Sequence, residues 1–163
     1  MPISDFLRAL RGKIGNDLLL LPGVAAVIHN AAGEVLIQKR EDDLFSLPAG
    51  AIEPGENPAT AIVREVYEET GLRVRPRRLL GIFGGETYRV RYPNGDQVEF
   101  TIALFECEIE SGELECKDGE SKELKFFSVS EIPALAVDYP RHLFQRPSTA
   151  VHFDTESRTF GEL

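Results

Sequence analysis

The 163-residue chain is 42% hydrophobic, which is enough for one domain with a real core. Its net charge is -9 at pH 7, which disfavours a broad nucleic-acid-binding surface because such surfaces need a basic footprint. No apolar run approaches the roughly 18 residues that span a bilayer, and Met1–Gly15 lacks the continuous apolar segment of a signal peptide. We therefore expect a cytoplasmic protein without a membrane or nucleic acid polymer as partner.

The N-terminal part of the chain predicts a helix followed by a pair of strands. Residues 1–17 favour a short amphipathic helix, because their apolar side chains gather on one side. Gly23–His29 is an apolar run of strand length, Asn30–Gly33 has the composition of a turn, and Glu34–Lys39 follows as a second strand. We expect the two strands to form a hairpin.

A helix is predicted over residues 58–70, between two clear boundary signals. Asn57 is a favoured N-cap residue and Pro58 a favoured first helical residue. Gly71 suits the left-handed conformation that commonly ends a helix. Between the predicted hairpin and this helix, the turn-rich segment 42–54 has room for one short strand at residues 44–47.

The rest of the chain predicts more strands and little helix. Strands are expected over residues 72–83, 86–92, 97–109 and 124–129, and short helices over 130–135 and 141–145. Residues 147–163 form a polar tail. Strands combined with a central helix predict a single α+β domain over residues 1–163, with an α/β/α layered arrangement.

The predicted central helix has an apolar side and an acidic side. At ~100° per residue, one side collects Ala59, Ile62, Val63, Val66 and Thr70. The opposite side collects Glu65, Glu68 and Glu69. Arg64 lies one turn before Glu68 and can pair with it. Such an acidic side is either a solvated helix face or one wall of a cation site.

The loop before this helix favours the cation site. It contains Gly50, Gly55 and Glu56, and glycines let the backbone approach a ligand closely. Carboxylates and a backbone carbonyl are hard oxygen ligands, which suit Mg²⁺ or Mn²⁺. Because Mg²⁺ in proteins is typically shared between carboxylates and substrate phosphates, the pattern predicts phosphate chemistry.

The residues from Gly50 to Leu72 resemble the Nudix box, G-x5-E-x7-R-E-U-x-E-E-x-G-U, where U is aliphatic. Gly50, Glu56 and the run Arg64–Leu72 match it without a departure. At an average usage of about 5–8% for each fixed residue, a chance match is on the order of one in a hundred million per start position. The resemblance implies a Nudix fold with a central mixed β-sheet flanked by helices.

The resemblance also implies roles for the residues of the box. Glu68, Glu69 and the carbonyl of Gly50 would be metal ligands, and Glu65 a further ligand or the general base. Arg64 and Glu56 would orient this set. Outside the box, the resemblance suggests an additional acid before a late strand. That acid would be Glu120, as a ligand or base, or Glu123, and a solvated acidic loop is the alternative for both.

Candidates for substrate contact lie on both sides of the box. Lys39 and Arg40 end a predicted strand and could contact phosphates, or be solvated there. Phe45 and Tyr88 could stack on a base, or belong to the core. In the family, a proline about sixteen positions past the box is a hint of ADP-ribose enzymes and a tyrosine a hint of dinucleoside polyphosphate enzymes. Tyr88 occupies that place, and the next proline is Pro93.

The function implied by the resemblance is metal-dependent hydrolysis of a pyrophosphate bond in a nucleoside diphosphate linked to another group. The substrate would be a small phosphorylated nucleotide, and ADP-ribose, dinucleoside polyphosphates, nucleotide sugars and nucleoside triphosphates all stay open. The alternative is a non-catalytic Nudix domain that senses a nucleotide metabolite. Many members of the family form dimers, but this sequence does not set the oligomeric state.

Overall fold

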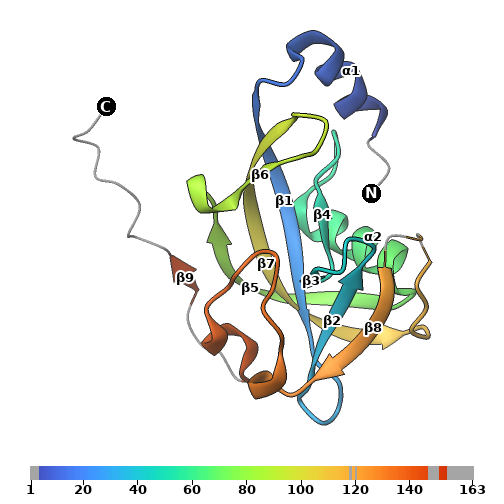
Figure 1. The fold of residues 1–163 in the computed structure, drawn as a ribbon. Helices are drawn as coiled ribbons and strands as arrows, with labels where there is room; N and C mark the ends of the chain where they lie inside the picture. Colours follow the sequence, from blue (N-terminus) through green and yellow to red (C-terminus); the bar gives the residue numbers. More distant parts are fainter. Residues whose placement is uncertain (1–3, 118, 120, 147–150, 154–163) are drawn as a thin grey trace.

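A computed structural model of the chain describes residues 4–117, 119, 121–146 and 151–153 (Figure 1). The helices are α1 (Asp5–Ile14), α2 (Pro58–Thr70) and the short 3-10 helices η1 (Glu86–Tyr88), η2 (Val129–Glu131) and η3 (Arg141–Phe144). The strands are β1 (Leu18–Ile28), β2 (Val35–Arg40), β3 (Phe45–Ser46), β4 (Ala49–Ala51), β5 (Arg73–Phe83), β6 (Arg89–Arg91), β7 (Gln97–Ser111), β8 (Ser121–Phe127) and β9 (His152–Phe153). The predicted α+β class is confirmed.

The strands form two sheets. The larger has the order β4-β1-β7-β5-β9, with β6 paired to β7. It is mixed, because β1 runs parallel to β7 while β4 and β5 run antiparallel to their neighbours β1 and β7. The smaller sheet has the order β3-β2-β8 and is antiparallel throughout. Figure 1 shows the smaller sheet beside α2 and β4.

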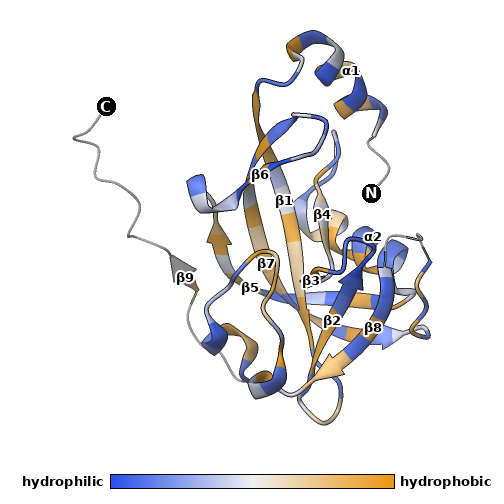
Figure 2. Ribbon diagram, viewed as in Figure 1, coloured by the Kyte–Doolittle hydropathy of each residue, from blue (hydrophilic) through white to orange (hydrophobic). Residues whose placement is uncertain are grey.

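The larger sheet is covered on both faces, which gives the layered arrangement. On one face α2 buries Ile62 and Val66 against residues of β1, β5 and β7. On the other face the segment that carries η2 and η3 buries Tyr139, Leu143 and Phe144. Figure 2 shows hydrophobic residues along β1 and β7, whereas the ends of β2 and β8 beside α2 are hydrophilic. Polar side chains are therefore concentrated where the two sheets approach α2.

The predicted hairpin between residues 23–29 and 34–39 is wrong. The two strands exist, but β1 lies in the larger sheet and β2 in the smaller one, and only the bridge between His29 and Val35 joins them. Both edges of β1 are taken by β4 and β7. Since β1 and β2 are apolar on both faces, neither sequence specifies which sheet it joins.

Other predicted elements differ in type or length. The predicted strand 86–92 begins with η1, because Gly85 has a φ of 89° and Tyr88 turns back to pack on Phe83. The predicted helices at 130–135 and 141–145 are only the 3-10 turns η2 and η3. Strand β4, made of small residues, was not predicted although it carries Gly50.

The predicted N-terminal helix is confirmed as α1. The Ser4 hydroxyl accepts a hydrogen bond from Leu7 N at 3.3 Å, and Leu7 is buried with Leu21, Ala51 and Val98. No helix in the described part of the chain has the length and apolar character needed to cross a membrane.

The predicted boundaries of α2 are also confirmed. The Asn57 side chain accepts from Thr60 N at 3.0 Å, and Gly71 adopts the left-handed conformation with a φ of 75°. The segment after β7 then covers the helix end, where Glu115 N donates to Thr70 O at 3.0 Å. This closure fixes the end of α2 that follows the glutamates.

We predict that Gly71→Ala destabilises the protein more than Gly33→Ala does. Both glycines have a φ near 80°, so each alanine meets a left-handed strain of roughly 1–2 kcal/mol. A Cβ at Gly71 would also lie 2.6 Å from the backbone oxygen of Glu113, whereas one at Gly33 meets nothing within 4 Å. Urea unfolding should show an additional loss of about 1–3 kcal/mol for Gly71→Ala. Equal losses would contradict this account of the helix end.

Candidate active site

Gly50 on β4 and the side chain of Glu65 on α2 pack directly against each other in the candidate site. A Cβ built on Gly50 would lie 2.0 Å from the carboxyl carbon of Glu65, so no other residue fits there while that carboxylate stays in place. Gly50 is itself fixed by the pairing of β4 with β1, in which it lies opposite Val24. The glycine therefore lets the Glu65 carboxylate pack directly on the backbone of β4.

Glu65 is a buried carboxylate with little compensation. Glu65 is only 2% exposed, and its Oε1 has no hydrogen-bond partner among the described residues. Arg64 Nη1 lies 2.9 Å from that oxygen as an ion pair, without the alignment of a hydrogen bond. Desolvation raises the pKa of Glu65 to about 7, and the nearby Arg64 only partly opposes this rise.

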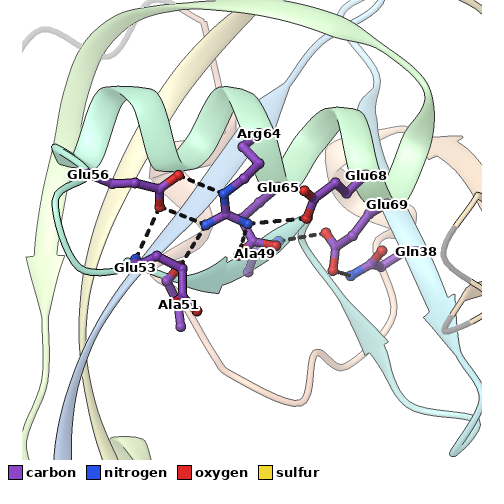
Figure 3. Close-up of polar contacts among 9 residues, drawn as sticks. All are labelled: Gln38, Ala49, Ala51, Glu53, Glu56, Arg64, Glu65, Glu68 and Glu69. Atoms are coloured by element: carbon purple, nitrogen blue, oxygen red, sulfur yellow. Dashed lines mark hydrogen bonds and ion pairs between the residues drawn. The ribbon is translucent and has the colours of Figure 1, made fainter. Parts of the chain in front are cut away.

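Arg64 connects the loop, the strand and the acidic helix (Figure 3). Its Nε and Nη2 donate to the two carboxylate oxygens of Glu56 at 2.7 and 2.8 Å. Its Nη2 also donates to Ala51 O at 3.1 Å, and Nη1 donates to Glu68 Oε2 at 3.2 Å. The hydrogen bonds from Arg64 lower the pKa of Glu56, and those same bonds raise the pKa of Arg64. The predicted pair of Arg64 and Glu68 is thus present within a larger ion-pair network.

Glu69 is held by a separate set of donors. Its Oε2 accepts from Ala49 N at 2.9 Å, and its Oε1 accepts from Gln38 Nε2 at 3.2 Å (Figure 3). Glu69 is 7% exposed. It therefore links α2 both to β4 and to the smaller sheet.

The three glutamates, which were predicted on the side of α2 opposite the apolar one, differ in exposure. Glu65 and Glu69 are buried and only Glu68 is exposed, while Ala59, predicted to face inward, is also exposed. The reason is that β4 and β2 cover the side of α2 that would otherwise meet water. Helical periodicity separates the two sides of a helix but does not show what covers each one.

Among the residues that the structure describes, no group of three or more His, Cys, Asp or Glu side chains is already arranged to hold a metal ion. The carboxylates instead point to different protein donors: Glu68 to Arg64, and Glu69 to Gln38 and Ala49. The residues of the box are thus brought to one place, next to the Gly50 backbone, but each is held separately.

Two predicted phosphate contacts have other partners in the structure. Lys39 Nζ lies 3.0 Å from the carboxylate of Asp43 and 5.9 Å from the centre of the Phe45 ring. Arg40 donates to Asp42 at 2.8 Å. Both are at the end of β2 next to the turn that leads into β3, and their part in substrate binding stays a prediction.

The two predicted base-stacking aromatics are engaged in packing. Phe45 makes an edge-to-face contact with Phe127 at 6.4 Å between ring centres. Tyr88 packs on Phe83 and Tyr139, and its hydroxyl donates to Asp138 O at 3.1 Å. Core packing therefore accounts for both residues without a substrate.

The acids predicted outside the box fall in two places. Glu123 is exposed on β8, where it lies opposite Lys39 in the smaller sheet. Glu120 lies outside the described residues. Ser121, the next residue in the chain, is buried and donates to Gln38 Oε1 at 2.8 Å. Ser121, at the start of β8, thus hydrogen-bonds to Gln38, which in turn donates to Glu69.

Gln38, Ser121 and the amide of Ala49 are the parts of the site that sequence reasoning missed. One signal for Gln38 was available, because it follows the apolar residues Val35, Leu36 and Ile37 within a buried strand. A polar residue in such a run requires a buried partner. The partner itself, Glu69, is 31 positions away in the chain, and no local pattern identifies it.

Comparison with known proteins identifies the family. The model of the NUDIX domain family matches residues 19–147, which include the whole box and the surrounding strands. The chain belongs to the Nudix hydrolase family. It is accordingly a pyrophosphohydrolase, and members of this family hydrolyse pyrophosphate bonds of nucleoside diphosphate derivatives with a divalent metal ion.

Individual Nudix relatives differ in the substrates that their names give. The chain is 34% identical to an ADP-ribose pyrophosphatase of Methanocaldococcus jannaschii, over 76% of this chain and 72% of that protein. It is 28% identical to an RNA pyrophosphohydrolase of Bartonella bacilliformis, over 80% of this chain and 92% of that protein. The crystal structure of an ADP-ribose pyrophosphatase from Streptococcus suis shares the fold, with a TM-score of 0.63 and 24% identity over 82% of this chain and 96% of that chain.

The residues of the Nudix box fit a divalent cation chemically. Glu65 Oε1 is a buried oxygen without a hydrogen-bond donor in the described structure, and the absence of a side chain at Gly50 leaves its backbone directly against that carboxylate. Carboxylate and carbonyl oxygens are the donors that hard divalent cations prefer. The donor set thus suits the metal that the family uses.

We predict that Gly50→Ala is destabilising only while Glu65 is present. The added methyl group overlaps the Glu65 carboxylate, and overpacking of this kind typically costs about 1–3 kcal/mol. In a Glu65→Ala background that overlap is gone, so the same change should cost much less. Urea unfolding of the wild type, both single variants and the double variant measures the coupling between the two positions. Additive effects would show that the two residues do not determine each other.

Proposed function

We propose that the chain hydrolyses the pyrophosphate bond of ADP-ribose with Mg²⁺ or Mn²⁺ held by Glu65, Glu68, Glu69 and the carbonyl of Gly50. The metal assignment rests on one observation above the others, the buried Glu65 carboxylate packed on the Gly50 backbone. The choice of ADP-ribose is supported by the Methanocaldococcus relative, which is named for that substrate and is 34% identical.

The bound ion would stabilise charge on the pyrophosphate oxygens and lower the pKa of a water molecule. The protein's own residues orient the carboxylates that would hold the ion. Arg64 orients the Glu56 and Glu68 carboxylates from one side, and Gln38 and Ala49 N fix Glu69 from the other. Arg64 is therefore proposed as a positioning residue, because its donors are directed to protein oxygens.

The acid beyond the box is proposed to be Glu120, as a further ligand or as the base that takes a proton from water. It precedes Ser121, whose hydroxyl contacts Gln38 and through it Glu69. Glu123 is the less favoured of the two, because its strand partner is Lys39 and not a residue of the box. Glu120→Gln and Glu123→Gln assayed side by side would separate them, with the larger loss of kcat expected for Glu120→Gln.

Charge argues against a polymeric substrate. The chain has a net charge of -9, and the affinity of proteins for nucleic acid comes largely from cationic side chains that neutralise phosphates. A small nucleotide requires only a bound cation and a few local donors. We therefore expect ADP-ribose to be preferred over RNA, the substrate given in the names of some relatives.

A substrate panel tests this proposal. ADP-ribose, a dinucleoside polyphosphate, a nucleotide sugar, a nucleoside triphosphate and a 5′-triphosphorylated RNA oligonucleotide are compared with Mg²⁺ and with Mn²⁺. The highest kcat/KM is expected for ADP-ribose, with AMP and ribose 5-phosphate as products. A higher value for another compound would replace ADP-ribose as the substrate, and no turnover of any compound would contradict the enzymatic function itself.

We predict that Glu69→Gln lowers kcat/KM at least about 100-fold, because even residues that only support metal ligands typically contribute 10–100-fold. The change removes charge but keeps the shape of the side chain. Glu113→Gln is the matched control, since Glu113 is exposed and lies outside the site, and it should retain full activity. A loss of less than about tenfold in Glu69→Gln would exclude Glu69 as a ligand.

A further inference from the structure

A buried amide stands between the acidic helix and the smaller sheet. Gln38 is 4% exposed on β2. Its Nε2 lies 3.2 Å from Glu69 Oε1, 3.1 Å from Ser46 Oγ and 3.4 Å from Leu47 O. Its Oε1 accepts from Ser121 Oγ at 2.8 Å. Both ends of the amide are thus engaged, and by residues of different elements.

The orientation of this amide is set by the chemistry of its neighbours. Leu47 O and the Glu69 carboxylate can only accept hydrogen bonds, so the NH₂ end of Gln38 must face them. The opposite orientation would place its carbonyl oxygen against both acceptors. Ser121, whose hydroxyl can donate, lies at the other end of the amide and donates to the Gln38 oxygen. Gln38 therefore presents a fixed donor to Glu69.

Gln38 interrupts an otherwise apolar face of the smaller sheet. The residues on the same face of the smaller sheet, Leu36 and Leu124, pack against the apolar side of α2. A further apolar residue would extend that contact, whereas a buried amide is costly unless all of its hydrogen bonds are made. Gln38 instead donates a hydrogen bond to Glu69, a carboxylate of the Nudix box.

We propose that Gln38 is a positioning residue for the metal site, which holds the Glu69 carboxylate in place and is itself held by Ser121. The proposal rests on the proposed role of Glu69 as a metal ligand. It extends the site beyond the box to β2 and β8, and it gives the buried Ser121 hydroxyl a function. Outer residues of this kind typically contribute 10–100-fold to metal affinity or activity.

The test measures Mn²⁺ binding to the full chain by electron paramagnetic resonance, without substrate, together with kcat, KM and urea unfolding. Gln38→Leu should weaken Mn²⁺ binding by roughly 10–100-fold and lower kcat at subsaturating metal, with KM little changed. Gln145→Leu is the control, because Gln145 is exposed, and it should bind Mn²⁺ as the wild type does. A folded Gln38→Leu variant with wild-type Mn²⁺ affinity would overturn the proposal.

A milder variant keeps the test decisive if Gln38→Leu fails to fold. Ser121→Ala removes one neutral hydrogen bond from the Gln38 oxygen, so Mn²⁺ binding should weaken by roughly 2–12-fold. Wild-type Mn²⁺ affinity in this variant would then refute the link through Ser121.

An exchange of the two side chains separates the positioning role from a packing role. Gln38→Glu with Glu69→Gln restores an amide beside a carboxylate, so stability should recover relative to Gln38→Glu alone. Mn²⁺ affinity and kcat should stay low, because the carboxylate is now on the wrong residue. If Mn²⁺ affinity and kcat also recovered, an amide beside a carboxylate would suffice in either order, which would contradict the separate roles proposed for Gln38 and Glu69.

The single variant Glu69→Gln distinguishes the two proposals. If it binds Mn²⁺ as the wild type does, Glu69 is not a ligand and the proposed metal site is at fault. If it loses binding while Gln38→Leu retains it, the metal site stands and the positioning role of Gln38 is refuted.

Discussion

The site depends on the contact between the Glu65 carboxylate and the Cα of Gly50. The carboxylate lies so close to β4 that a methyl group on Gly50 would overlap it. Because β4 is an edge strand paired to β1, and β1 is paired along its length to β7, the position of Glu65 is tied to the most extensively paired part of the fold. The acidic helix is therefore not an appendage on the surface, as its composition alone would allow.

The charges around this contact explain why the arrangement suits a cation. Arg64 is close to three carboxylates, those of Glu56, Glu65 and Glu68, and the strongest of its hydrogen bonds are directed to Glu56. Burial raises the pKa of Glu65, and one guanidinium shared among three carboxylates only partly opposes this rise. A buried carboxylate without a full complement of partners is unfavourable for folding. A divalent ion bound beside Glu65 would supply a positive partner for this carboxylate.

Local chemistry made part of this structure predictable from sequence. Asn57, Pro58 and Gly71 act within a few residues of themselves, so the limits of α2 follow from their side chains and backbone preferences. The sheet to which a strand belongs does not follow from such local signals. Residues 18–28 and 35–40 are adjacent in the chain but belong to separate sheets, because pairing is decided by distant strands such as β7 and β8. For the same reason helical periodicity placed Glu65 and Glu69 on one side of α2 but could not show that β4 and Gln38 bury them.

The sequence predicts the reaction better than the substrate, because different residues determine the two. The proposed metal ligands are held by contacts within the fold, and the spacing of the box reflects those contacts. The aromatic candidates for nucleotide recognition, Phe45 and Tyr88, make packing contacts that explain their presence without a substrate. Tyr88 packs on Phe83 and Tyr139 and donates to the backbone of Asp138, so its presence is expected whether or not a base ever stacks on it. A tyrosine at this place therefore carries little information about substrate, and evidence for ADP-ribose must come from turnover.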